Sequence, residues 1–182
     1  MKKSGYTLIE LLIAIAVFTV VIAAPAGFFV TAIKGQQKTL ASQEMYDNIS
    51  YVLEYMSRAL RMAKKDFEGD CCSVPNTNYE LTGGGSGIIF KNYQGECQEF
   101  YWNGTQLFEV KNKLEAVQLT SSNIAVKDFM IEQSGWSQTD TIQPKVKLFL
   151  SIEEGIKGEL DELHPKMKIQ TSVSQRKLDI EY

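Results

Sequence analysis

The N-terminal part of the chain combines a continuous apolar run with an amphipathic stretch. Residues 11–30 contain no charged side chain, and the apolar run continues to Ile33. About 20 apolar residues are the length that an α-helix needs to cross a hydrocarbon core of roughly 30 Å. Lys2 and Lys3 precede the run, an asymmetry that keeps an N-terminus on the cytoplasmic side. The pattern predicts a membrane-inserted helix.

After residue 33 the apolar pattern changes from continuous to one-sided. From residue 34 onward, apolar side chains recur at intervals of three and four, which is the period of one helix face. The stripe consists of Tyr46, Ile49, Leu53, Met56, Leu60, Ala63 and Phe67, widened by Met45, Val52 and Ala59. We expect the helix to continue to about residue 65, with this stripe packed on the chain's own sheet.

The rest of the chain shows the alternation and turn signals of β-strands. Strands are predicted at residues 88–90, 97–102, 105–108, 115–120, 124–132, 145–152, 167–174 and 177–182. Asn103 and Gly104 lie between two of them and predict a two-residue hairpin. A helix followed only by strands is typical of an α+β fold, with one helix layer on an antiparallel sheet.

Composition permits a membrane segment and one modest globular domain. The 182 residues are 44% apolar and carry a formal net charge of −3. Nucleic-acid-binding proteins usually carry an excess of basic residues, which this chain lacks, so we do not expect nucleic acid as a partner. A short basic patch consists of Arg58, Arg61, Lys64 and Lys65. We interpret it as a solvated face or a contact with an acidic neighbouring subunit, since no aromatic stacking platform lies beside it.

One acidic residue, Glu10, stands at the start of the apolar run. A carboxylate at the centre of a membrane helix costs about 3 kcal/mol, and less near the headgroups. The string from Gly5 to Ile15, GYTLIELLIAI, resembles the class III signal of type IV prepilins and pseudopilins. Tyr6 departs from the usual pattern, because the family most often has Phe at that position.

The resemblance implies a processing pathway and an assembly role. A prepilin peptidase would cut between Gly5 and Tyr6, and Tyr6 would be N-methylated. The new α-amino group, with an ordinary pKa near 8, would be a cation able to pair with Glu10 of a neighbouring subunit. Further partners implied are related pilin subunits, a platform membrane protein and an assembly ATPase. The implied fold is pilin-like, with a long N-terminal helix packed on an antiparallel sheet.

We divide the chain into four parts on this basis. They are a leader at residues 1–5, a hydrophobic helix half at 6–33, an amphipathic helix half at 34–66 and a β domain at 67–182. Pro25 and Gly27 interrupt the hydrophobic half, and proline removes a backbone hydrogen bond, so we expect a helix kink there. In type IV pilins, a proline near this depth accompanies a stretch that unwinds in the filament.

Two other interpretations of the N-terminus stay open. Ala24, Pro25 and Ala26 resemble the cleavage site of a conventional secretory signal, whose removal would release a soluble protein starting at Gly27. The apolar run extends beyond that site, and Glu10 stands at its start, which argues against this interpretation. An uncleaved membrane anchor is the remaining alternative.

Three cysteines, two of them adjacent, predict one disulfide and one further thiol. Cys97 is expected to pair with Cys71 or Cys72, closing a loop that adds about 3 kcal/mol of stability. We favour Cys72, because it is nearer the strands. The remaining thiol is expected to be buried or to crosslink subunits.

Candidate catalytic and metal-binding groups are sparse. The acidic stretch at residues 153–162 offers oxygen ligands for calcium, but its spacing matches no EF-hand, so an exposed connection between strands is the simpler interpretation. His164 is the only histidine, and it precedes a proline in the same charged stretch. The sequence contains no phosphate loop, dinucleotide fingerprint or nucleophile elbow. We expect no enzymatic activity, no metal and no cofactor.

Together these features predict a structural subunit of a type IV pilus-like filament. It would be inserted in the cytoplasmic membrane as a prepilin and lie at the cell surface or outside the cell after assembly. One alternative is a minor pilin, or a minor pseudopilin of a type II secretion-like system, at a filament tip. The other is a membrane-anchored or secreted binding module that forms no polymer.

Overall fold

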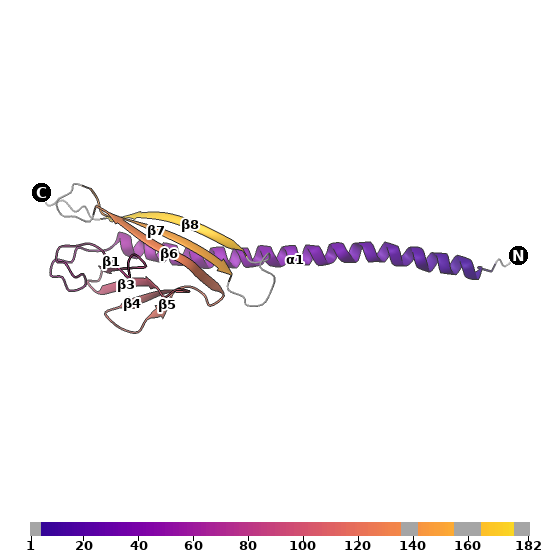
Figure 1. Cartoon of the computed structure of the whole chain (residues 1–182), viewed down its shortest axis with the longest axis horizontal. Helices are drawn as coiled ribbons and strands as arrows, with labels where there is room; N and C mark the ends of the chain where they lie inside the picture. The colour runs from indigo at the N-terminus through magenta and orange to yellow at the C-terminus, as the bar shows by residue number, and fades with distance from the viewer. Residues whose placement is uncertain (1–4, 136–141, 155–164, 177–182) are drawn as a thin grey trace. The chain divides into compact units, whose positions relative to one another are not determined.

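The computed structural model of the chain describes residues 5–135, 142–154 and 165–176. In these ranges one α-helix, α1 (Leu8–Arg61), is followed by eight β-strands (Figure 1). Two compact units divide the chain, Met1–Ala41 and Ser42–Tyr182. The long N-terminal helix and the antiparallel sheets confirm the predicted α+β, pilin-like class of fold.

The first unit is helical from Leu8 and presents its apolar side chains outward. The large apolar residues from Leu8 to Ile33 have exposed fractions between 47% and 77%. Among the described residues, α1 is the one helix long and apolar enough to cross a membrane. Its threonine hydroxyls bond to carbonyls of their own helix, as Thr19 does to Ala16 at 2.8 Å. Such a surface is suited to lipid or to other apolar helices, because exposed apolar area is unfavourable in water.

In the second unit α1 is amphipathic. The residues that face the core are Met45, Ile49, Val52, Met56 and Leu60, all buried. Tyr46 and Phe67 were expected in this stripe, but they are 57% and 61% exposed. Because the row that starts at Met45 packs into the core, Tyr46 faces solvent. Phe67 lies beyond the end of the helix.

Residues distant in sequence satisfy the carbonyl groups at the end of α1. The last carbonyls of a helix have no partner within it. The Tyr79 hydroxyl donates to the Leu60 carbonyl at 2.7 Å, and the Arg176 N–H donates to the Arg61 carbonyl at 2.9 Å. The chain then leaves the helix, because Lys64 forms a β-bridge with Lys91. The helix accordingly ends before residue 65, where the amphipathic pattern had placed its end.

The strands form two antiparallel sheets. The first sheet contains, in spatial order, β1 (Glu80–Thr82), β2 (Gly87–Lys91), β3 (Cys97–Trp102), β4 (Leu107–Lys111) and β5 (Val117–Gln118). The second contains β6 (Ile124–Ser134), β7 (Lys145–Glu154) and β8 (Lys166–Ser174). The Ile131 N–H donates to the Gly85 carbonyl at 2.9 Å, which links the two sheets. The strand predicted at residues 177–182 lies outside the described residues.

The turn between β3 and β4 differs from the predicted two-residue hairpin. Trp102 pairs with Leu107, so four residues connect the strands. The Asn103 side-chain oxygen accepts hydrogen bonds from the N–H groups of Thr105 at 3.0 Å and Gln106 at 2.9 Å. This side-chain turn stabilises the wider loop, and Gly104 supplies the left-handed φ of 101° that the loop requires.

The core of the second unit is built from α1 and both sheets. Its largest fully buried side chains include Tyr79, Phe90 and Phe100. The rings of Phe90 and Phe100 lie 5.7 Å apart between centroids, and those of Tyr79 and Phe90 lie 6.3 Å apart. The same cluster contains Val126, Leu148 and Val173 from the second sheet. One apolar core therefore joins the helix to both sheets.

We expect Ile49→Ala to lower the free energy of unfolding by about 2–5 kcal/mol, because it removes buried methyl groups and leaves a cavity. Tyr51→Ala, on the exposed face of the same helix, should cost about 0.5 kcal/mol or less. Urea unfolding of the detergent-solubilised full chain, followed by tryptophan fluorescence, measures both. Equal losses for the two variants would contradict the assignment of faces.

Candidate functional site

The residues of the predicted processing site lie immediately before α1. Gly5, Tyr6 and Thr7 are not helical, and the Tyr6 side chain is 88% exposed. Because α1 begins at Leu8, Thr7 occupies the N-cap position and Glu10 the third helical position. The bond between Gly5 and Tyr6 is therefore outside the helix.

Glu10 contacts the start of its own helix. Its carboxylate accepts a hydrogen bond from the Thr7 N–H, at 3.5 Å. A threonine N-cap followed three residues later by glutamate is the spacing of a capping box, and a negative charge suits the N-terminal end of a helix. The spacing from Thr7 to Glu10 is the sequence signature of this capping role, which was not among the expectations for Glu10. Within one chain, Glu10 is thus placed to cap α1.

Pro25 and Gly27 lie inside α1, and the helix continues through both without a break. Proline has no N–H, so it cannot donate to the carbonyl four residues earlier, that of Val21. The Thr31 hydroxyl donates to the Gly27 carbonyl at 3.0 Å. The kink at these residues, and its unwinding in a filament, stay predictions.

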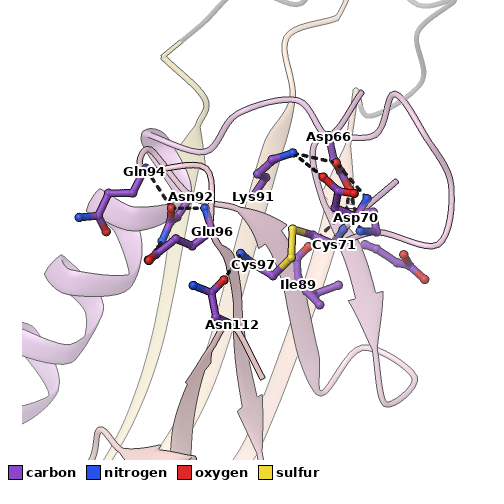
Figure 2. Close-up of a disulfide and its surroundings, with 12 residues drawn as sticks. Asp66, Asp70, Cys71, Ile89, Lys91, Asn92, Gln94, Glu96, Cys97 and Asn112 are labelled. Carbon is purple, nitrogen blue, oxygen red and sulfur yellow. Dashed lines mark hydrogen bonds and ion pairs between the residues drawn. A yellow bond between two sulfur atoms is a disulfide. The ribbon is translucent and has the colours of Figure 1, made fainter. Parts of the chain in front are cut away.

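The disulfide joins Cys71 to Cys97, which corrects the predicted pairing of Cys72 with Cys97 (Figure 2). Cys72 is a buried free thiol whose Sγ lies 3.9 Å from the Ile89 carbonyl oxygen. Nearness to the strands along the sequence was the wrong criterion. The side chains of adjacent loop residues point in different directions. Here the Cys72 side chain is buried in the interior, and the Cys71 side chain bonds to Cys97 at the start of β3.

Asp66 holds the loop that carries these cysteines. Its carboxylate accepts hydrogen bonds from the N–H groups of Cys71 at 2.8 Å, Cys72 at 2.9 Å and Asp70 at 3.3 Å. Figure 2 shows the Lys91 ammonium reaching two acidic side chains, at 3.5 Å from Asp66 and 3.1 Å from Asp70. Asp66 is fully buried. No role was expected for Asp66 from the sequence, because a single aspartate in a polar loop carries no distinctive signal.

These contacts set the ionisation of the loop. Burial by itself raises the pKa of the Asp66 carboxyl, but the backbone N–H groups and the Lys91 charge outweigh it, so this pKa lies below its ordinary value. Burial raises the pKa of the Cys72 thiol. Since the thiolate is the reactive form, Cys72 is protected by both burial and protonation.

A cleft of about 370 Å³ lies between the end of α1 and the first sheet, lined by residues that include Ala59, Met62 and Tyr93. At its edge, the buried Glu109 carboxylate accepts hydrogen bonds from Tyr55 at 2.6 Å and Gln98 at 2.5 Å. Lys111 lies 3.4 Å from the same carboxylate. The network satisfies its members and connects helix to sheet, so we interpret it as structural.

The remaining candidate residues are either exposed or outside the described ranges. Arg58 of the basic patch pairs with Glu54 at 2.6 Å, and both side chains are exposed. His164 and residues 155–164 of the acidic stretch lie outside the described residues, as do residues 1–4 of the leader. Within the described ranges, no group of three or more histidine, cysteine or acidic residues is placed to hold a metal ion.

Residues 1–24 match the family model described as the prokaryotic N-terminal methylation motif. The N-terminus is a class III prepilin signal. Such a signal is typical of type IV pilin-like and pseudopilin precursors, and it includes the string from Gly5 to Ile15 on which the resemblance rests. Comparison with curated proteins and comparison with solved structures each gave no match.

Mass spectrometry can test the disulfide between Cys71 and Cys97 and the burial of the Cys72 thiol. Peptides of the unreduced protein should contain Cys71 linked to Cys97, with Cys72 alkylated only after unfolding. Mass spectrometry after alkylation under native and denaturing conditions measures this. A linked pair of Cys72 and Cys97, or ready labelling of Cys72 in the native protein, would contradict the arrangement.

Asp66→Asn should lower the free energy of unfolding by about 1–3 kcal/mol at neutral pH, because the buried N–H groups and Lys91 lose a charged acceptor. A depressed carboxyl pKa stabilises the fold above the unfolded-state value near 4, and this contribution is lost as pH falls through the lower folded-state value. The cost of the substitution should therefore shrink below about pH 4. Urea unfolding at pH 7 and at pH 3 tests this, with Asp128→Asn, at an exposed aspartate outside this network, as control.

Proposed function

We propose that this chain is a structural subunit of a type IV pilus-like filament. In this proposal a prepilin peptidase cuts after Gly5, Tyr6 is N-methylated, and the subunit polymerises through α1. The observation that carries the proposal is the prepilin signal at residues 1–24, followed directly by a helix whose apolar residues are exposed from Leu8 to Ile33. A platform membrane protein, an assembly ATPase and related subunits are the partners that such a pathway requires.

The apolar half of α1 supports this because it suits two environments. In the membrane its side chains contact lipid, and in a filament they would contact the same half of other subunits. Lipid tails are as apolar as leucine, so the exchange involves little hydrophobic free energy, and packing and polar contacts decide which state is favoured. The few polar groups in this half therefore carry most of the specificity.

Glu10 is the polar group best placed to act in assembly. Before docking it lies near the start of the helix, bonded to its own Thr7 N–H at 3.5 Å. After cleavage, the Tyr6 amine of a neighbouring subunit would offer it a cation. Inside a bundle of apolar helices each charge needs its partner, since an unpaired buried charge costs roughly 3–5 kcal/mol. The pair would set the axial register of adjacent subunits.

The second unit fits the role of filament surface. The prepilin signal suggests a structural rather than a catalytic protein. The disulfide between Cys71 and Cys97 suits a domain exposed outside the cytoplasm, where disulfides persist. We therefore place the apolar helix in the membrane and then in the filament core, with the β domain at the cell surface.

The N-terminal peptide of protein made in its native host should start at Tyr6 and carry one added methyl group. Mass spectrometry of the purified subunit measures both. A peptide starting at Gly27 would mean a secreted soluble domain, and an intact leader in a host with an active prepilin peptidase would mean an uncleaved anchor. A correctly processed chain that is scarce in sheared filaments would be a minor subunit at the filament tip.

Glu10→Ala and Glu10→Gln should both reduce filament yield at least tenfold while leaving cleavage intact. Glutamine can still accept the Thr7 hydrogen bond of a capping box but carries no charge. The comparison therefore separates the charge from the helix cap. Immunoblots of sheared filaments and of whole cells measure assembly and processing. Normal filaments from Glu10→Gln would show that the charge is dispensable.

A further inference from the structure

The cleft between the end of α1 and the first sheet has two walls. One wall is a strip of α1 on which Tyr55, Ala59 and Met62 follow one another at helical spacing. The other consists of the turn between β2 and β3 together with Gln98 and Lys111, which pair directly across β3 and β4. Its volume of about 370 Å³ lies within the usual range of small-molecule pockets, roughly 300–1,000 Å³. The cleft is therefore large enough to hold a small molecule.

The turn between β2 and β3 is held in shape by its own hydrogen bonds. The side-chain oxygen of the buried Asn92 accepts from the N–H groups of Gln94 at 2.9 Å and Glu96 at 3.0 Å (Figure 2). Gly95 supplies the left-handed φ of 92° that this turn requires. Tyr93, which lines the cleft, is therefore held in place although it is 57% exposed. A wall that exists before binding reduces the entropy lost when a ligand enters.

The described residues that line the cleft include two cations, Arg58 and Lys111, and no carboxylate. Lys111 donates to the Tyr55 hydroxyl at 2.9 Å and lies 3.4 Å from the Glu109 carboxylate at the cleft's edge. The hydrogen bond to Tyr55 and the charge of Glu109 raise the pKa of Lys111, so it is a cation at neutral pH. Arg58 pairs with Glu54 at 2.6 Å, but its side chain is 74% exposed, and such an exposed pair contributes little. Arg58 can therefore exchange Glu54 for another carboxylate.

The rest of the cleft surface is mostly apolar. Ala59, Met62 and the rings of Tyr55 and Tyr93 supply carbon atoms, and Met62 is 36% exposed. Apolar side chains beside two cations suit a ligand in which an apolar group is joined to a carboxylate. A stable protein partner would need a much larger contact, of about 800 Å² on each side. The cleft by itself therefore fits a small molecule better than a protein.

We propose that this cleft binds a small amphipathic carboxylate, an apolar ring or chain that ends in a carboxylate group. The apolar part lies between Met62 and Tyr93, and the carboxylate accepts hydrogen bonds from Arg58 and Lys111. Glu109 remains the internal partner of Lys111. All of these residues belong to the second unit, and the prepilin signal does not enter the argument. The binding site and the filament function can therefore fail separately.

Ligand-observed NMR of the full chain in nanodiscs of neutral lipid tests the site, with phenylacetate and the uncharged phenylacetamide as probes. The two probes share a ring and a chain and differ in charge. Phenylacetate should bind with a Kd of about 1 mM, the weak affinity of so small a ligand, and severalfold more tightly than phenylacetamide. Added salt should weaken the binding of phenylacetate alone, because it screens the attraction to the two cations. Empty nanodiscs serve as the control for partition into lipid.

Substitutions at exposed positions locate the binding without disturbing the core. Arg58→Gln and Tyr93→Ala should each weaken phenylacetate binding severalfold, because they remove a cation and a ring from the cleft. Arg61→Gln makes the same charge change in the next turn of α1, outside the cleft lining, and should bind phenylacetate normally. Urea unfolding confirms that the three variants are folded, since exposed substitutions change stability little.

Three results would overturn the proposal. The first is no detectable binding of phenylacetate at about 10 mM, well above the expected Kd. The second is equal affinity for phenylacetate and phenylacetamide, which would mean that the cations recognise no charge. The third is an equal loss of binding in Arg58→Gln and Arg61→Gln, which would mean that the charge acts from outside the cleft.

Discussion

The burial of one side of α1 by the second unit is the interaction on which the remaining features depend. Met45, Ile49 and Val52 point into a core shared by both sheets, which fixes the rotation of the helix about its own axis in this unit. Once that rotation is fixed, the opposite face is fixed as well. A helix with apolar residues on one side only leaves its other side available for charged residues, which are exposed here. The hydrophobic core thus determines which residues of α1 remain exposed in this unit.

At the end of the helix, polar groups rather than apolar ones position the loop that carries the cysteines. The chain turns from α1 into a loop where a single buried carboxylate, Asp66, accepts three backbone hydrogen bonds and meets Lys91. Burying a charge is unfavourable unless it is paired and hydrogen-bonded, and here both conditions are met. This loop in turn places Cys71 beside β3. The covalent bond therefore depends on a hydrogen-bonded arrangement that forms around one residue.

The sequence was informative where a feature depends on periodicity or on a long motif. The apolar run to Ile33, the amphipathic pattern after it and the alternating strands each extend over many residues, so the helix and sheets could be predicted. The prepilin signal is equally long and ordered. Where one rotation or one hydrogen bond decides, sequence reasoning failed. It placed Tyr46 in the core, chose Cys72 over Cys71 and expected a shorter turn at Asn103, because neither the packing of α1 nor local side-chain hydrogen bonds can be read from spacing.

The start of α1 at Leu8 bears on the proposed processing after Gly5. Proteolytic enzymes act on extended backbone, and the segment from Gly5 to Thr7 is already non-helical. The proposed cut after Gly5 would therefore require no unwinding of α1, and Thr7 and Glu10, whose hydrogen bond caps the helix, would both remain on the processed chain. The proposed processing would thus leave the cap of α1 unchanged.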